Sequence, residues 1–407
     1  MSLEFNKVVD QVYKLGRMLD EIDLNASNRL DLAIERFYQA TDLDFIHKRV
    51  EMTRRPDVSG YRGAAPLDAP IHEVVCQTFP CPEFPASATI IAADGSQIYP
   101  AEPSPVHYFL VNIGLFTYHH GIDRVPDQYS VPRLFFHKDH VHDSSGRILS
   151  NRTIDARRTA TEMHELGAKC WELKDEARPL IALYDNHLLF WANEDVTGAR
   201  QLMQQYHGAL VHLHDSGAIL AGYVDNPMRS RVMIRLLHLL SLTDEEVRSS
   251  DLSSSRELEA VSDMQLFSAV LEAGERSAIM VQNSPRNLKY RQRGDSYEIA
   301  FFYLKTSSGY QESIARVDIP MWVARDRALV DELHSVLVSQ CSLQGRNPYP
   351  YALTRADELA YVSGKDKSKL DEMIAIELRK KGLNPHPFSG KAWGKQLARS
   401  TKRQHEM

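Results

Sequence analysis

Residues 88–96 read ATIIAADGS, an apolar and β-branched run that ends in an acidic residue and a glycine. Residues 88–93 predict a β-strand, since side chains of this kind fit a buried sheet. Asp94 stands where the strand meets Gly95, so its carboxylate is expected to project from a sheet end beside a tight turn. The alternative role for Asp94 is capping of that turn.

A second acidic residue lies in another apolar segment, residues 180–191, which read LIALYDNHLLFW. This segment predicts a strand that contains Asp185. An Asp embedded in an apolar strand is costly unless it is paired, hydrogen-bonded or bound to metal. An edge-facing Asp185 is the alternative, and two such acids on separate strands are a stronger signal of a site than either alone.

The segments around these two acids follow the order strand, strand, strand, helix, strand, helix, strand. This is the element order of the ribonuclease-H-like fold. The sequence therefore predicts an α/β protein with a ribonuclease-H-like mixed sheet flanked by helices, its core near residues 88–225. The predicted strands are 88–93, 108–118, 131–137, 180–191 and 218–224, and the predicted helices are 155–177 and 196–207.

Composition and periodicity divide the chain into four parts. These are a helical N-terminal segment (1–55), a Pro-rich connector with little regular structure (56–87), the main α/β domain (88–362) and a basic tail (363–407). One apolar face is expected on the first helix, from Val8, Val9, Val12, Leu15 and Leu19. A C-terminal α/β extension is predicted from a helix at 228–242, a loop at 243–255, strands at 277–281, 297–304 and 313–322, and helices after Asp326 and Thr354.

The helix at 155–177 supplies a third acid. At 3.6 residues per turn, its core face is defined by Ala156, Ala160, Met163, Gly167 and Cys170. Glu162 falls about 100° from the centre of that face, at its border, whereas Glu165 falls about 160° away, toward solvent. A border glutamate can bend into a site above a sheet, so Glu162 is the better candidate.

Three converging carboxylates suit one kind of chemistry. Hydrolysis of a phosphodiester needs an activated water and stabilised charge on the attacking and leaving oxygens. One or two Mg²⁺ or Mn²⁺ ions provide both, and these hard cations prefer oxygen ligands. Asp94, Glu162 and Asp185 are therefore predicted to hold a divalent metal.

Overall charge argues against a nucleic-acid partner, but its distribution does not. The chain of 407 residues carries a formal net charge of −6, whereas residues 363–407 hold eleven Lys or Arg against five Asp or Glu. An acidic body with a basic tail suits local contact with phosphates, and a solvated tail is the alternative. The side chains expected to make these contacts are Lys391, Lys395, Arg399, Lys402 and Arg403.

Location is indicated by cysteine usage and hydropathy. Four cysteines make a poor disulfide framework at this length, which favours a reducing cytoplasm. No run of about eighteen apolar residues and no signal segment at Met1 is found, so neither a membrane span nor secretion is expected.

These residues together resemble the NurA family of nucleases, ribonuclease-H-like enzymes that process DNA ends beside a hexameric HerA-type translocase. The order and spacing of the motifs carry the resemblance, which runs over about residues 88–362. The matching pieces are 93–96, Arg158 with Glu162, Asp185, 221–225, 274–277 and Tyr349 with Pro350.

The resemblance implies a function and a set of partners. It implies a metal-dependent deoxyribonuclease using Mn²⁺ or Mg²⁺, with 5′→3′ exonuclease and single-strand endonuclease activity in DNA end processing and repair. It also implies a homodimer that docks on a HerA-like ATPase. Carried over by position, Asp94, Glu162 and Asp185 would bind metal, and Tyr349 would position the phosphate or the water.

Two positions depart from the family pattern. The family His expected eight residues after Tyr349 is Asp357 here, which can bind metal or orient water but cannot donate as an imidazolium does. The family's usual Asp-Gly-Ser reads Asp185-Asn186-His187, so His187 is a candidate replacement for the missing His.

Two other functions remain open. An inactive DNA-binding or scaffolding partner is suggested by Asp357, although the three presumed metal ligands are retained. An actin-like or sugar-kinase-like ATPase shares the strand order, but it needs a second Gly-rich phosphate turn, for which the single glycine at Gly274 is a thin substitute. No P-loop and no Gly-x-Gly-x-x-Gly fingerprint is present.

Three further clusters have structural explanations. Alternation along a strand separates His137 from His140 and His142, so this stretch is predicted to be a surface strand. The second cluster, Cys76 and Cys81 with His72, lacks a second ligand pair for a zinc site. The third cluster, His212, His214 and Asp215, is predicted to share one face of a strand.

Overall fold

A computed structural model describes residues 5–383, except 59, 69, 70, 72, 101–105, 177, 308–312 and 346, and leaves out the side chains of residues 17–26. Several residues named in the predictions lie outside the described residues: His72, Lys391, Lys395, Arg399, Lys402 and Arg403. The side chain of Leu19 is also outside the described ones.

A single mixed sheet organises the protein, and its central five strands follow the predicted order. They are β3 (Ala88–Ile98), β4 (Phe109–His120), β5 (Asp127–Phe135), β6 (Leu180–Tyr184) and β7 (Ile219–Asp225). In space they lie in the order β5-β4-β3-β6-β7. The β3–β4 and β4–β5 pairs are antiparallel and the β3–β6 and β6–β7 pairs are parallel. This arrangement confirms the mixed, ribonuclease-H-like α/β core.

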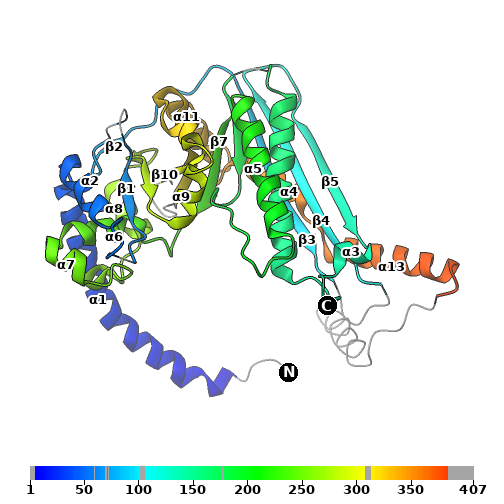
Figure 1. The fold of residues 1–407 in the computed structure, drawn as a ribbon, viewed down its shortest axis with the longest axis horizontal. Helices are drawn as coiled ribbons and strands as arrows, with labels where there is room; N and C mark the ends of the chain where they lie inside the picture. The colour runs from blue at the N-terminus through cyan, green and yellow to red at the C-terminus, as the bar shows by residue number, and fades with distance from the viewer. Residues whose placement is uncertain are drawn as a thin grey trace.

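Alternation along β3 sends its side chains into two different cores. Ile91 and Ala93 pack beneath α4 (Asn151–Glu172) and α5 (Ala199–Asp215), which lie together against the sheet in Figure 1. Ile90 and Ala92 pack on the other face with α11 (Arg327–Ser342) and α12 (Tyr351–Ala360). A period of two is what a strand buried on both faces requires.

The sheet continues beyond β7 with strands that lie later in the chain. The neighbours in order are β11 (Ser313–Pro320), β10 (Ile299–Ser307), β9 (Met280–Gln282) and β1 (Ala64–Pro66). Two further strands, β2 (Thr78–Phe79) and β8 (Arg276–Ser277), pair with each other beside β10. The Pro-rich connector therefore contributes two short strands, β1 and β2, to the far side of the sheet.

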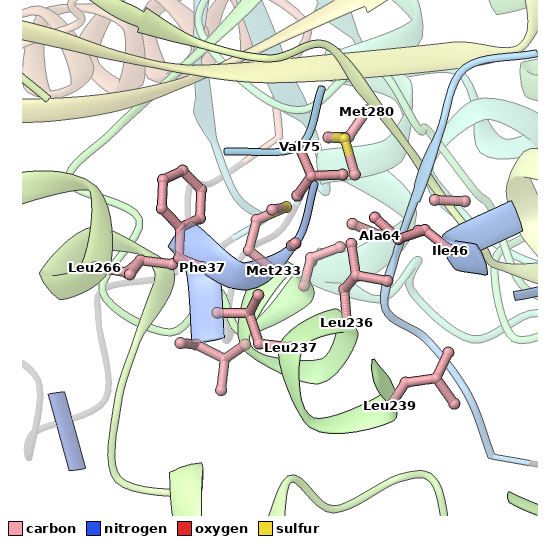
Figure 2. Packing of buried hydrophobic residues seen from close by; sticks show 14 of the residues in the cluster. Phe37, Ile46, Ala64, Val75, Met233, Leu236, Leu237, Leu239, Leu266 and Met280 are labelled. Carbon is pink, nitrogen blue, oxygen red and sulfur yellow. The ribbon is translucent and has the colours of Figure 1, made fainter. Parts of the chain in front are cut away.

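The N-terminal helices build a second hydrophobic core with a helix that lies much later in the chain (Figure 2). Phe37 of α1 (Val9–Gln39) and Ile46 of α2 (Leu43–Met52) meet Met233, Leu236 and Leu237 of α6 (Val232–Leu240). Leu266 of α8 (Asp263–Val270) completes the cluster, which lies at the other end of the molecule from α4 and α5 in Figure 1. The N-terminal segment is therefore part of the folded body.

The remaining elements are short or peripheral. They are α3 (Lys138–Val141), α7 (Asp244–Ser249), α9 (Pro285–Arg291), α10 (Met321–Ala324) and α13 (Gly364–Lys380), with 3₁₀ turns at Phe5–Lys7, Arg256–Leu258 and Asp295–Tyr297. Within the described ranges, no helix combines the length and the apolar character needed to cross a membrane.

Helices replace several predicted strands and loops. The predicted strand face formed by His212, His214 and Asp215 is wrong, because α5 extends to Asp215 with buried residues at helical spacing that include Leu210 and Leu213. The predicted surface strand at His137, His140 and His142 is also wrong, because β5 ends at Phe135 and α3 follows.

The predicted loop at 243–255 contains helix α7. Thr243 and Glu246 form a capping box, in which each side chain accepts a hydrogen bond from the other residue's backbone N–H. This local signal starts a helix in spite of the polar composition that follows. Val247, which is fully buried, anchors the helix to the second core.

Gly114 of β4 provides a test of how closely α12 approaches the sheet. A Cβ atom at this position would collide with the backbone of Ala356 and Ala360. We expect Gly114→Ala to lower the free energy of unfolding by about 1–3 kcal/mol, because two rigid backbone segments must move apart. Urea denaturation measures the change.

The matched control is Gly208→Ala on α5, where a Cβ atom meets nothing within 4 Å. Alanine favours a helix over glycine, so this variant is expected to gain up to about 1 kcal/mol. Equal losses in the two variants would contradict the close approach at Gly114.

Candidate metal centre

The sequence suggested that Asp94 lies at the end of its strand, but the structure places it inside β3. The strand continues through Gly95 to Ile98, and Asp94 pairs in register with Gly114. The backbone N–H of Gly95 donates to Oδ1 of Asp94 at 2.7 Å. Asp94 also shares a hydrogen bond with Asp357 of α12, which places its carboxylate on the α12 side of the sheet.

Asp185 reaches the same side from the neighbouring strand. β6 ends at Tyr184, so Asp185 is the first residue after the strand rather than a residue within it. The hydroxyl of Tyr349 is hydrogen-bonded to Asp185, and Asp357 lies near enough for its charge to act on Asp185. Four of the predicted residues, Asp94, Asp185, Tyr349 and Asp357, are therefore neighbours.

Glu162 approaches the cluster from α4, which covers the opposite face. Its side chain is 3% exposed, and its carboxylate occupies the space that a Cβ atom at Gly95 would need. Tyr184 donates to Oε2 of Glu162 at 3.2 Å. The absence of a side chain at Gly95 is thus what allows Glu162 to lie against the backbone beside Asp94.

Glu165, one turn further along α4, points elsewhere. It forms an ion pair with Arg133 of β5. The helix geometry therefore separates the two glutamates as their angular spacing predicts, with only Glu162 directed at the acidic cluster.

Arg158 is the cation closest to Glu162. Its Nε lies 3.1 Å from Oε1 of Glu162. Its Nη1 donates to the carbonyl oxygen of Gly95 at 3.3 Å and to Oε1 of Gln97 at 3.1 Å. Arg158 therefore ties α4 to β3 directly beside the acids.

Burial and mutual repulsion disturb the acids strongly. Burial raises the pKa of Asp94 to about 7, helped by the negative charges of Glu162 and Asp185 and the hydrogen bond with Asp357. Burial also raises the pKa of Asp185, and Asp357 adds to the effect. Burial raises the pKa of Glu162 despite Arg158. Carboxyl groups in this state gain from a bound cation.

The residues present suit a divalent cation. Oε1 of Glu162 is buried without a hydrogen-bond partner in the described part of the protein, although its ion pair with Arg158 remains. All the donors nearby are oxygens, which suit Mg²⁺ or Mn²⁺. As they stand, however, no three His, Cys, Asp or Glu residues of the described ranges are grouped to hold one ion, so a bound cation would have to draw the carboxylates together.

Comparison with known proteins identifies the family. The sequence matches the model of the NurA domain over residues 88–362. The chain belongs to the NurA family. The resemblance found in the sequence is therefore confirmed. No curated protein matches the chain.

One solved structure supports the fold, and two others are similar at lower scores. The crystal structure of the NurA nuclease from Sulfolobus solfataricus matches with a TM-score of 0.50 and 13% identity, over 93% of this chain and 98% of that one. A structure of NurA bound to dAMP and manganese gives 0.37 and 10%, over 90% of this chain and 96% of that one. The catalytic domain of human Endonuclease V gives 0.30 and 9%, over 81% and 96%.

Sequence reasoning missed the partner of His187. Nδ1 of His187 lies 3.0 Å from Oδ2 of Asp318 in β11, a fully buried carboxylate that also accepts from Nε of Arg316 at 2.8 Å. Burial opposes ionisation of Asp318, but Arg316 and His187 outweigh it and lower the pKa to about 2. The missed signal is an Asp inside an apolar strand, SIARVDIP, the pattern that exposed Asp185.

The raised pKa of Asp94 predicts how the metal-free protein responds to pH. Below about pH 4 this carboxyl is protonated in both states. As pH rises from 3.8 to about 7, the unfolded chain ionises first, so the folded protein loses stability, and the full penalty applies above that range. We expect Asp94→Asn to raise the free energy of unfolding in EDTA by roughly 1–3 kcal/mol at pH 8 and by much less at pH 4.

Urea titrations at the two pH values measure this difference. Asp175→Asn, at an exposed position, is the matched control and should change stability little at either pH. A gain for Asp94→Asn of equal size at pH 4 and pH 8 would show that the charge of Asp94 is not the cause.

Proposed function

We propose that this protein is a divalent-metal-dependent DNA nuclease that hydrolyses phosphodiester bonds. The observation that carries the proposal is the gathering of Asp94, Asp185 and Asp357 on one side of β3 and β6, with Glu162 beside Gly95. This cluster occupies a ribonuclease-H-like sheet in a chain of the NurA family. Family membership supports nuclease activity, and the acids supply the charge that such chemistry needs.

Asp94, Glu162 and Asp185 are the proposed metal ligands. A bound Mn²⁺ or Mg²⁺ would supply Lewis-acid stabilisation of the phosphate and a water of lowered pKa. Arg158 holds Glu162 in place through its ion pair and keeps α4 against β3.

Tyr349 and Asp357 are the proposed positioning groups. Burial and the charge of Asp185 raise the pKa of Tyr349, so its hydroxyl keeps its proton and acts as a donor. Asp357, hydrogen-bonded to Asp94, can accept a proton from a water or orient it. Tyr349 and Asp357 would thereby place the scissile phosphate and the water relative to Asp185 and Asp94.

We extend the proposal to the activities that the family resemblance implies. These are 5′→3′ exonuclease and single-strand endonuclease cleavage, acting in DNA end processing and repair in the cytoplasm. A catalytically weakened DNA-binding or scaffolding protein is the second candidate. It is favoured by Asp357 in place of the family His and by the described carboxylates, which do not surround one common point.

The two glutamates of α4 separate these candidates. We expect Glu162→Gln to lower Mn²⁺-dependent cleavage of end-labelled single-stranded DNA by at least about 100-fold, the scale on which loss of one electrostatic element of a site reduces turnover. Glu165→Gln, one turn away and paired with Arg133, is the matched control and should keep wild-type activity. Gel analysis of the products also gives polarity and endonuclease cuts.

Three results are informative. Wild-type cleavage by both variants would mean that another nuclease contaminates the preparation or that Glu162 has no role. A wild-type protein that binds DNA but does not cleave it with Mn²⁺ or Mg²⁺ would favour the scaffolding candidate. Equal losses in both variants would point to damage of α4 rather than of a metal site.

We also propose that the protein is a homodimer that docks on a HerA-like hexameric ATPase. The predicted helix is present as α1, but in the single chain its apolar side chains are exposed: Val9 42%, Val12 60%, Tyr13 68% and Leu15 55%. Apolar side chains clustered on one helix mark a contact surface. They support association through α1.

Negative charge introduced on this apolar surface by substitution should prevent association. We expect Val12→Asp with Leu15→Asp to convert the dimer to a monomer, as measured by light scattering after size-exclusion chromatography. Gln11→Asp with Lys14→Asp adds the same two carboxylates at exposed polar positions of α1 and should leave the mass unchanged. A wild-type monomer would overturn the dimer, and dissociation by both pairs would overturn the role of the apolar face.

A further inference from the structure

An arginine-lined groove of about 960 Å³ lies at the end of β7, and Asp94, Glu162 and Asp185 are not among the residues that line it. It runs from the end of β7 to the start of α6 and to α9. Basic residues distant in sequence line it: Arg62, Arg229, Arg231, Arg235 and Arg286.

Most of this positive charge is unpaired. Of the residues that the structure describes, no acidic side chain comes within ion-pair distance of Arg62, Arg229, Arg235 or Arg286, whereas Arg231 reaches Glu259 only at 3.5 Å. Asp225 is the one acidic residue among those found to line the groove. Four uncompensated guanidinium groups around one hollow form a strong anion-attracting field.

The start of α6, which lines the groove, is held in place by Asp263. Asp263, which is fully buried, accepts hydrogen bonds from the backbone N–H of Val232 at 2.6 Å and of Met233 and Ile234 at 3.0 Å each. It also accepts from the hydroxyl of Tyr303 at 2.6 Å, which ties α6 to β10. Because Asp263 already occupies the backbone donors of Val232, Met233 and Ile234, the positive charge that an anionic ligand would meet here comes from the arginine side chains.

Asp225 connects the groove with the proposed metal ligands. Asp225 ends β7, the strand beside β6, and lies close enough to Asp185 for its charge to act on that carboxyl group. His187, two residues after Asp185, also lines the groove. A chain of phosphates lying in the groove would therefore lead toward Asp185.

We propose that this groove binds the phosphate backbone of a single DNA strand and leads it to the acidic cluster. The inference deepens the proposed nuclease function and rests on it for the role of the bound strand. Guanidinium groups match phosphate oxygens in geometry and charge. Apolar side chains that include Leu189, Val224 and Met228 also line the groove and can contact sugars and unpaired bases.

Binding without metal tests the groove. We compare the wild type with the triple variant Arg229→Gln, Arg235→Gln and Arg286→Gln, using a fluorescein-labelled thymidine oligonucleotide in EDTA so that hydrolysis plays no part. At 0.1 M salt, fluorescence anisotropy should give the triple variant a Kd more than about tenfold higher than that of the wild type. Each phosphate contact to a single strand contributes about −0.7 to the slope of log K against log salt concentration. The slope should become shallower by about 2 when three contacts are lost.

A charge-matched control separates local contact from net charge. The triple variant Arg55→Gln, Arg248→Gln and Arg379→Gln removes the same charge at exposed positions outside the groove. Its salt slope should differ from that of the wild type by less than the roughly 0.7 that one phosphate contact contributes. Thermal unfolding of both triples checks folding. Photo-crosslinking of an iodouracil oligonucleotide gives a second readout, with attachment expected near Met228, which is 68% exposed.

The outcomes distinguish this inference from the proposed function. Equal Kd and slope for wild type and groove variant, or crosslinks only outside the groove, would overturn the groove. A groove effect with duplex DNA but not with single strands would overturn the choice of ligand. Groove-dependent binding in EDTA together with no cleavage in Mn²⁺ or Mg²⁺ would keep the groove and overturn the nuclease.

Discussion

Two glycines, Gly95 and Gly114, allow the helices on both faces of the sheet to approach β3 and β4 at one point. Gly95 leaves room for the carboxylate of Glu162 on the α4 side, and Gly114 leaves room for the backbone of α12 on the other. Asp94 lies beside Gly95 in β3 and opposite Gly114 in β4. An interior packed to crystal density has no slack to move a helix by the width of a methyl group. Without these glycines Glu162 and Asp357 could not both approach Asp94, and the acids would not interact.

The price of that approach is buried negative charge, and the protein offsets it unequally. Arg158 relieves Glu162, while Arg316 and His187 keep Asp318 ionised. Among the described residues, neither Asp94 nor Asp185 forms an ion pair with a cationic side chain. Tyr349 and the charge of Arg158 offset the burial of Asp185 only in part, and burial with repulsion from neighbouring carboxylates raises the pKa of both acids. The residual charge is thus concentrated where oxygen ligands for a cation are available, whereas the uncompensated arginines lie in the adjacent groove. Opposite fields side by side can hold a polyanion while a cation is held next to it.

Local patterning predicted the central strands, the helices over them and the acids on them, because burial on both faces of β3 and one-sided burial of α4 follow directly from residue spacing. Contacts between distant segments were not predictable in this way. Nothing near Phe37 or Ile46 indicates that their partners are Met233 and Leu237. The groove was missed for the same reason: Arg62, Arg229 and Arg286 come together only in the fold, while the sequence-local excess of positive charge directed attention to residues 363–407.

Asp357 shows how one substitution changes the balance of such a site. Where the family pattern has an imidazole, this chain places a carboxylate that is hydrogen-bonded to Asp94 and acts on Asp185. A neutral or cationic ring would lessen repulsion among the acids, whereas a further carboxylate increases it and makes the cluster depend more on a bound cation. A hydrogen bond between two carboxyl groups also requires that one of them keeps a proton, which a cation must displace. If the proposed cation binds at this cluster, its binding would be linked to proton release at Asp94 more tightly than in the histidine pattern.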